Sequence, residues 1–180
     1  TNETLTQTSW NAEAQLLGIA LQGRMPETDQ RPPQNLVSLI DTSVSMDQPD
    51  KLLLKHSFRL MLDQLDATDE IAIVTYAGNA GQVLEPTSAA EKTSILGALA
   101  RLQAGGSTHG QAGLQLAYRT ASQMATAQEV TRIILATDGD FNLGLSDSEQ
   151  LKDYIAQQRD SGIYLSVLGF GRGNLNDATL

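Results

Sequence analysis

The chain has 180 residues, a net charge of −9 and no cysteine. This length fits a single domain that buries a sizeable core. The acidic charge argues against binding to nucleic acid or to an anionic membrane surface, no apolar run is long enough to insert across a membrane, and the lack of cysteine excludes disulfide bonds and thiolate metal sites.

The first part of the chain, residues 1–35, is predicted to contain one strand and an irregular connection. Residues 1–9 are polar, and we expect them to be loose. Leu17, Ile19 and Leu21 then occupy alternate positions, which predicts a strand with one buried face. Prolines and charged residues interrupt this pattern further on. Because they indicate a connection and not a domain linker, we expect this part to belong to the same domain as the rest.

From residue 36 onward, strands alternate with helices. Strands are predicted at residues 36–41, 70–77, 82–84, 131–137 and 163–168, and helices at about 50–65, 95–102, 114–124 and 146–158. A capping box formed by Ser146 and Glu149 supports the fourth helix, and a further helix is expected to begin near residue 176. This alternation predicts a three-layer α/β/α fold, in which helices cover both faces of a Rossmann-like, mainly parallel sheet.

Three loops of the predicted fold carry carboxylate and hydroxyl oxygens. Asp41, Ser43 and Ser45 stand at every second position directly after the first long strand. Thr108 ends a Gly-Gly-Ser-Thr sequence before the third helix, and Asp138 directly follows another strand. Ligands of open α/β sheets bind outside the carboxyl ends of the strands, so these loops are expected to meet at one edge. Hard oxygen donors around one point suit Mg²⁺ or Mn²⁺.

In this arrangement the chain resembles the von Willebrand factor type A domains and their metal-ion-dependent adhesion site. The motifs are Asp-x-Ser-x-Ser at 41–45, the Gly-Gly-Ser-Thr loop at 105–108 and Thr-Asp-Gly at 137–139. One such motif alone is a weak signal, whereas three in the right order are a strong one. The resemblance covers about residues 36–170 and is greatest to bacterial members. It implies a von Willebrand factor A-type domain over residues 36–180, ending before the C-terminal helix of the family.

The resemblance also implies a role for each motif residue. One Mg²⁺ or Mn²⁺ would be held by Asp41, Ser43, Ser45, Thr108 and Asp138. The serines would ligate the ion directly, and the threonine directly or through water. The aspartates would act directly or through water and would orient the hydroxyls. An Asp or Glu carboxylate of another protein would take the remaining position, which implies a cation-dependent adhesion module and not an enzyme.

The chemistry of this ligand set explains why it would bind a partner. Neutral hydroxyls donate little charge, so the ion stays electron-poor, and nearby helix N-termini favour an incoming anion. Val44 stands where bacterial relatives often have glycine, and valine does not readily adopt φ > 0. The loop is therefore expected to hold an ordinary backbone conformation there, or the site is altered. Because bacterial members are often linked to the cell envelope, the expected location is extracytoplasmic, in the envelope or secreted.

The main alternative is a Mg²⁺-dependent hydrolase or phosphatase on a Rossmann-like sheet, with Asp41 as the nucleophile. Phosphatases of the haloacid dehalogenase type also place an aspartate after the first strand, but they need a second aspartate two positions further on. Ser43 occupies that position here, which weighs against this alternative. A phosphate-binding Gly-x-x-x-x-Gly-Lys-Ser/Thr loop and a Gly-x-Ser-x-Gly nucleophile elbow are both missing from the sequence.

Overall fold

The computed structural model describes residues 2–5, 16–19, 31–43, 48–76, 81–102, 110–137 and 148–169. Contacts within the chain divide it into two compact units, Thr1–Arg31 and Pro32–Leu180. The two units are described separately below. The expectation that residues 1–35 belong to the same domain as the rest stays a prediction.

The N-terminal unit contains a two-stranded antiparallel sheet. Strand β1 (Asn2–Leu5) pairs with β2 (Leu16–Ile19). The strand predicted from the alternating leucine and isoleucine residues is thus confirmed as β2. The expectation that residues 1–9 are loose is wrong for β1. Its polar residues gave no strand signal because pairing with a neighbouring strand, and not intrinsic preference, decides such cases.

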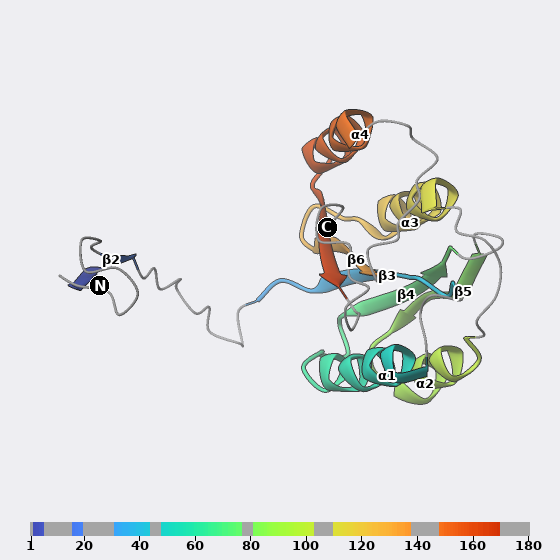
Figure 1. Ribbon diagram of the computed structural model, residues 1–180. Helices are drawn as coiled ribbons and strands as arrows, with labels where there is room; N and C mark the ends of the chain where they lie inside the picture. Colours follow the sequence, from blue (N-terminus) through green and yellow to red (C-terminus); the bar gives the residue numbers. More distant parts are fainter. Residues whose placement is uncertain are drawn as a thin grey trace. The chain divides into compact units, whose positions relative to one another are not determined.

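The second unit is built around a five-stranded sheet with the order β5-β4-β3-β6-β7. Its elements are β3 (Gln34–Ile40), α1 (Gln48–Leu62), β4 (Glu70–Thr75), β5 (Gly81–Ser88), α2 (Lys92–Ala100), α3 (Gly110–Met124), β6 (Val130–Thr137), α4 (Ser148–Asp160) and β7 (Ile163–Gly169). All neighbouring strands are parallel except β4 and β5, which are antiparallel. Helices α1 and α2 lie on one face of the sheet, and α3 and α4 lie on the other (Figure 1). The predicted three-layer, mainly parallel α/β/α fold is therefore confirmed.

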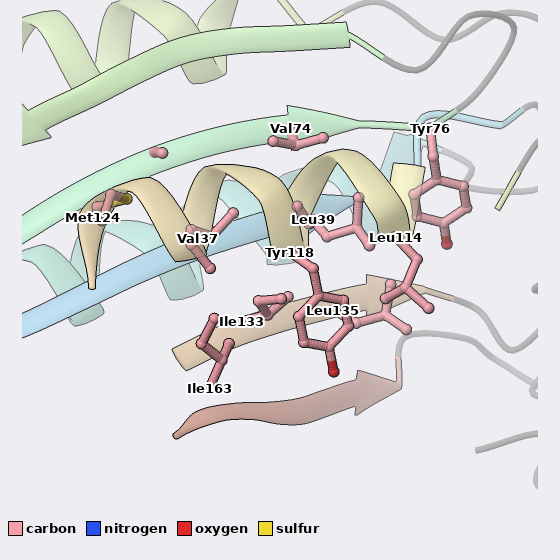
Figure 2. Packing of buried hydrophobic residues seen from close by; sticks show 13 residues of the cluster. Val37, Leu39, Val74, Tyr76, Leu114, Tyr118, Met124, Ile133, Leu135 and Ile163 are labelled. Carbon is pink, nitrogen blue, oxygen red and sulfur yellow. The ribbon is translucent and has the colours of Figure 1, made fainter. Parts of the chain in front are cut away.

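Alternation of side chains along the strands builds a separate core on each face of the sheet. From β3, Val37 and Leu39 join the cluster under α3, whereas Leu36 and Ile40 join the cluster under α1 and α2. Figure 2 shows the first cluster, in which α3 lies along the sheet. Helix α3 buries positions three and four residues apart, the spacing of an amphipathic helix.

Strand β5 differs most from its predicted length. It was predicted from residues 82–84 but extends over Gly81–Ser88. Glu85 and Pro86 interrupt its apolar pattern. Among the described strands β5 pairs only with β4, so one of its sides makes no ladder hydrogen bonds and a proline is tolerated there. The expected helix near residue 176 lies outside the described residues.

Buried polar side chains fix the amino ends of the central strands. Asp69, which is fully buried, accepts the backbone N–H of Gln34 at 2.8 Å and that of Asp66 at 2.7 Å. The side-chain amide of Asn35 donates to the Met124 carbonyl oxygen at 2.8 Å, at the end of α3. These bonds tie β3 to the start of β4 and to the end of α3.

The order of the strands creates a topological switch point at the opposite edge of the sheet. Strand β4 lies on one side of β3, and β6 lies on the other. The helices that follow β3 and β6, α1 and α4, lie on opposite faces of the sheet (Figure 1), and open α/β sheets bind their ligands at such a switch point. No helix in the described part of the chain is long and apolar enough to cross a membrane.

Candidate metal centre

Three side chains form a row across the carboxyl ends of the central strands. Asp41 follows β3, Tyr76 follows β4, and Thr137 ends β6. Ile40 pairs with the residue before Tyr76 and with the residue before Thr137, so the three side chains stand in register. The N–H of Asp41 donates to the carbonyl oxygen of Ala136 at 2.9 Å and extends the ladder by one bond. By alternation the row lies on the face covered by α3.

The carboxylate of Asp41 is the centre of this row. Its side chain is buried, with 1% of the residue exposed. The Oδ2 atom accepts the hydroxyl of Tyr76 at 3.0 Å and the hydroxyl of Thr137 at 3.4 Å. The Oδ1 atom accepts the backbone N–H of Ser43 at 2.7 Å. Three donors from three segments thus set the orientation of the carboxylate, and hydrogen bonds to a charged acceptor are the strong ones.

The bond between Asp41 and Ser43 explains the local fold of the loop. An aspartate that accepts the N–H two residues further on forms an Asx turn, a common way for a chain to leave a strand. This turn buries both Thr42 and Ser43, of which 6% and 5% is exposed. The first acid and the first serine of the Asp-x-Ser-x-Ser motif are therefore held next to each other at the strand end.

The five predicted metal ligands divide into two groups. Asp41 and Ser43 lie together at the predicted edge of the sheet. Ser45, Thr108 and Asp138 lie outside the described residues, as does Val44. Convergence of all five side chains on one ion stays a prediction.

Sequence reasoning missed two residues that contact the Asp41 carboxylate. Thr137 belongs to the Thr-Asp-Gly motif, but only the following aspartate was predicted to take part in the site. Tyr76 was predicted to belong to a strand and was given no role in the site. The sequence places each of them near the end of a predicted strand, but the register that brings both level with Asp41 is given by the structure.

The chemistry of this edge fits a hard divalent cation. A carboxylate offers about four lone-pair positions, and the described residues fill three of those on Asp41. On Oδ1 the described residues supply only the N–H of Ser43, so this atom is suited to a cation or to a cation-bound water. Within the described ranges no three His, Cys, Asp or Glu side chains gather into a metal cluster. The predicted set does not depend on such a cluster, because three of its five members are hydroxyls.

Comparisons with known proteins agree with the motifs. The sequence profile of the von Willebrand factor type A domain matches residues 36–140. The uncharacterized protein YfbK of Escherichia coli (strain K12) is 40% identical over 177 residues, which is 98% of this chain and 31% of that protein. The chain spans about a third of the length of YfbK and of a second curated relative, the uncharacterized protein sll0103 of Synechocystis.

Two solved structures share the fold at lower identity. Manganese-loaded TRAP protein from Plasmodium vivax superposes with a TM-score of 0.67 at 17% identity, over 82% of this chain and 61% of that one. The pilus adhesin SpaC from Lactobacillus rhamnosus GG, in an open conformation, gives a TM-score of 0.62 at 17% identity, over 78% of this chain and 24% of that one. At such identities the likeness shows the shared fold alone.

Proposed function

The chain belongs to the von Willebrand factor type A domain family, and from this premise we propose that it is a divalent-cation-dependent protein-binding module. Domains of this family generally serve in adhesion and protein interaction, and they are generally not enzymes. The observation that carries the proposal is the buried carboxylate of Asp41, which three donors orient at the switch point of the sheet.

In the proposed site one Mg²⁺ or Mn²⁺ is held by five side chains. These are Asp41, Ser43, Ser45, Thr108 and Asp138. The neighbouring positions of Asp41 and Ser43 support the first two assignments. In sequence, Asp138 directly follows Thr137, and Thr108 precedes α3 by two residues, which supports the assignment of these two. Ser45 is assigned from the Asp-x-Ser-x-Ser motif. When bound, the ion supplies an electron-poor centre that an Asp or Glu carboxylate of a partner protein completes.

The described residues would keep such an ion electron-poor. The hydroxyls of Tyr76 and Thr137 both donate to Oδ2 of Asp41. Each bond draws part of the negative charge away from the side of the carboxylate that faces the ion. The remaining proposed ligands include three neutral hydroxyls, which neutralise no charge. An incoming carboxylate is therefore the group that best satisfies the ion.

The structural relatives support the cation and the location that we propose. One of them is a manganese-loaded protein and another is a pilus adhesin. By this analogy we infer an extracytoplasmic location, in the cell envelope or in the secreted fraction. The analogy rests on fold alone, so the partner has to be found by experiment.

Nothing in the described structure favours the hydrolase alternative. A nucleophilic carboxylate must reach its substrate, whereas Asp41 is buried and accepts three hydrogen bonds. Ser43 also stands where a phosphatase of the type considered above has its general acid. We therefore do not propose catalysis.

Thermal unfolding in the presence and absence of metal tests the proposal. A ligand that binds only the folded state stabilises it by about 2.7 kcal/mol at 100 times its Kd, which is roughly a 5–10 °C rise in Tm for a domain of this size. We expect this rise with Mg²⁺ or Mn²⁺ in the wild-type chain and none in Asp41→Ala.

An exposed acid provides the matched control for this experiment. Asp63 is exposed and pairs with Lys92 at 2.8 Å on the surface. Asp63→Ala removes the same charge from the same acidic chain, so it should keep the full metal-dependent rise. If neither ion shifts the Tm of the wild-type chain, prepared free of metal, the proposed site is contradicted.

A further inference from the structure

Tyr76 joins the core of the domain to the metal centre. It directly follows β4, is fully buried, and packs in the cluster under α3 (Figure 2). A buried tyrosine hydroxyl generally needs a hydrogen-bond partner. The hydroxyl of Tyr76 donates to Oδ2 of Asp41 at 3.0 Å. Its ring is thus held by the core, while its hydroxyl reaches the proposed metal ligand.

Gly113 in the first turns of α3 makes room for this ring. A Cβ atom on Gly113 would collide with Cβ of Tyr76, and it would lie 3.1 Å from Cγ of Tyr76 and 3.4 Å from Cδ1 of Leu39. Glycine inside a helix is less favourable than alanine. The close approach of the Tyr76 side chain to the backbone of α3 accounts for glycine at this position, and it ties the start of α3 to Tyr76.

The hydrogen bonds of Asp41 are unequal on its two oxygens. The Tyr76 bond to Oδ2 is 3.0 Å long and the Thr137 bond is 3.4 Å long, so Tyr76 is the stronger donor. Together they fill the lone pairs of Oδ2. On Oδ1 the N–H of Ser43 fills one position, and no other residue of the described ranges bonds to this atom. The orientation of the carboxylate therefore presents Oδ1, and not Oδ2, to the site.

We propose that Tyr76 is a positioning residue of the metal centre, which acts through Asp41 and is itself seated by Gly113. The inference rests on the proposed function and adds a residue to it. Without the hydroxyl, the remaining donor to Oδ2 among the described residues is Thr137, at its longer distance. The N–H of Ser43 still holds Oδ1, but the carboxylate is oriented less firmly, and its affinity for the ion falls. Loss of a hydrogen bond to a metal ligand typically costs about 10–100-fold in metal affinity.

Calorimetric titration with Mn²⁺ tests the inference on the whole chain. Tyr76→Phe keeps the ring in the core and removes only the hydroxyl, so we expect Mn²⁺ to bind 10–100-fold more weakly. Tyr118→Phe is the matched control. Tyr118 is buried in the same cluster, and its hydroxyl has no hydrogen-bond partner in the part of the chain that the structure describes. Its removal should leave the Mn²⁺ affinity unchanged.

The outcomes separate this inference from the proposed function. If the wild-type chain binds no Mn²⁺, the proposed function is contradicted. If the wild-type chain binds Mn²⁺ and Tyr76→Phe binds it equally well, only the role of Tyr76 is contradicted.

A second measurement needs no metal. In chelator, the losses of Tm in Tyr76→Phe and Asp41→Ala should be less than additive when the two changes are combined, because both remove the same bond. Additive losses would overturn the inference by themselves.

Discussion

Tyr76 and Tyr118 are buried tyrosines of one core that use their hydroxyls differently. The hydroxyl of Tyr76 donates to Asp41. The hydroxyl of Tyr118 has no partner among the described residues, although its ring meets the ring of Tyr154 edge to face, with centroids 5.6 Å apart. An unsatisfied buried polar group costs about 1–3 kcal/mol. The ring of Tyr118 therefore contributes to stability through its packing, whereas its hydroxyl does not.

Because Tyr118 is buried, the free energy of unfolding is expected to vary with pH in the alkaline range. Burial, with a smaller contribution from Tyr154, raises the pKa of Tyr118 from 10.0 to about 12. Between these values the unfolded chain loses the proton while the folded chain keeps it, so stability falls as pH rises. This contribution is on the order of 2 kcal/mol once pH exceeds both values. Tyr118→Phe should therefore lose less stability than the wild-type chain between pH 10 and pH 12.

Urea unfolding at several pH values between 8 and 12 checks this prediction. At pH 8 Tyr118 is protonated in both the folded and the unfolded chain. The difference in the free energy of unfolding between Tyr118→Phe and the wild-type chain at this pH therefore serves as the baseline. The difference should shift in favour of the variant above pH 10. If the free energies of unfolding of the two chains keep the same difference up to pH 12, the raised pKa of Tyr118 is contradicted.

At the scale of elements, periodicity was sufficient to predict most of the second unit. In β3, Ser38 is the single polar residue between Leu36 and Ile40, and β6 carries an unbroken apolar run at residues 133–136, as expected for parallel strands buried on both faces. The same signal failed for β1, whose strand character depends on its pairing with β2. It also failed for most of β5, an edge strand that needs little burial.

The candidate site also contains one part that the sequence predicts and another that depends on the tertiary fold. Asp41 and Ser43 were predictable because they belong to a local motif, and the structure places them together. The contacts of Tyr76 with Asp41 and Gly113 join residues at least 35 positions apart in the chain. They depend on strand order, register and the depth at which α3 packs. None of these three properties is encoded in a short sequence pattern.

The two ends of the strands are expected to have separable roles. Asp69 precedes β4 and Tyr76 follows it, so about 20 Å of extended strand separates them. Asp69 accepts backbone N–H groups of Gln34 and Asp66, and hydrogen bonds to charged groups contribute about 1.5–3 kcal/mol each. Asp69→Ala should lower the free energy of unfolding by about 2–4 kcal/mol and leave the Mn²⁺ affinity of the folded protein unchanged.

Urea unfolding of Asp69→Ala checks the expected loss of stability, and Mn²⁺ titration of the same variant checks the unchanged affinity. Asp63→Ala is again the control, because its exposed pair with Lys92 contributes about 0–1 kcal/mol. A loss of Mn²⁺ affinity in folded Asp69→Ala would show that the two edges are coupled and would contradict the separation.

At the scale of the whole molecule, net charge constrains how a partner binds. The chain carries a net charge of −9, and the proposed partner contributes an acidic side chain. The acidic chain and the acidic group of the partner repel each other over a distance of about one Debye length, near 10 Å at 0.1 M salt. Attraction then has to come from the cation itself, at short range. Binding should therefore require the ion and should not weaken as salt screens the repulsion.

Capture from an extract of the source organism tests this constraint. The immobilised wild-type chain should retain a partner in Mg²⁺ or Mn²⁺ and release it in chelator, whereas Asp41→Ala should retain none under either condition. Because salt screens like charges, capture at 150 mM salt should equal or exceed capture at 50 mM. Asp63→Ala should behave as the wild-type chain does. A partner that stays bound in chelator, or that is lost as salt rises, would show binding through ordinary charge pairs and would contradict a bridging cation.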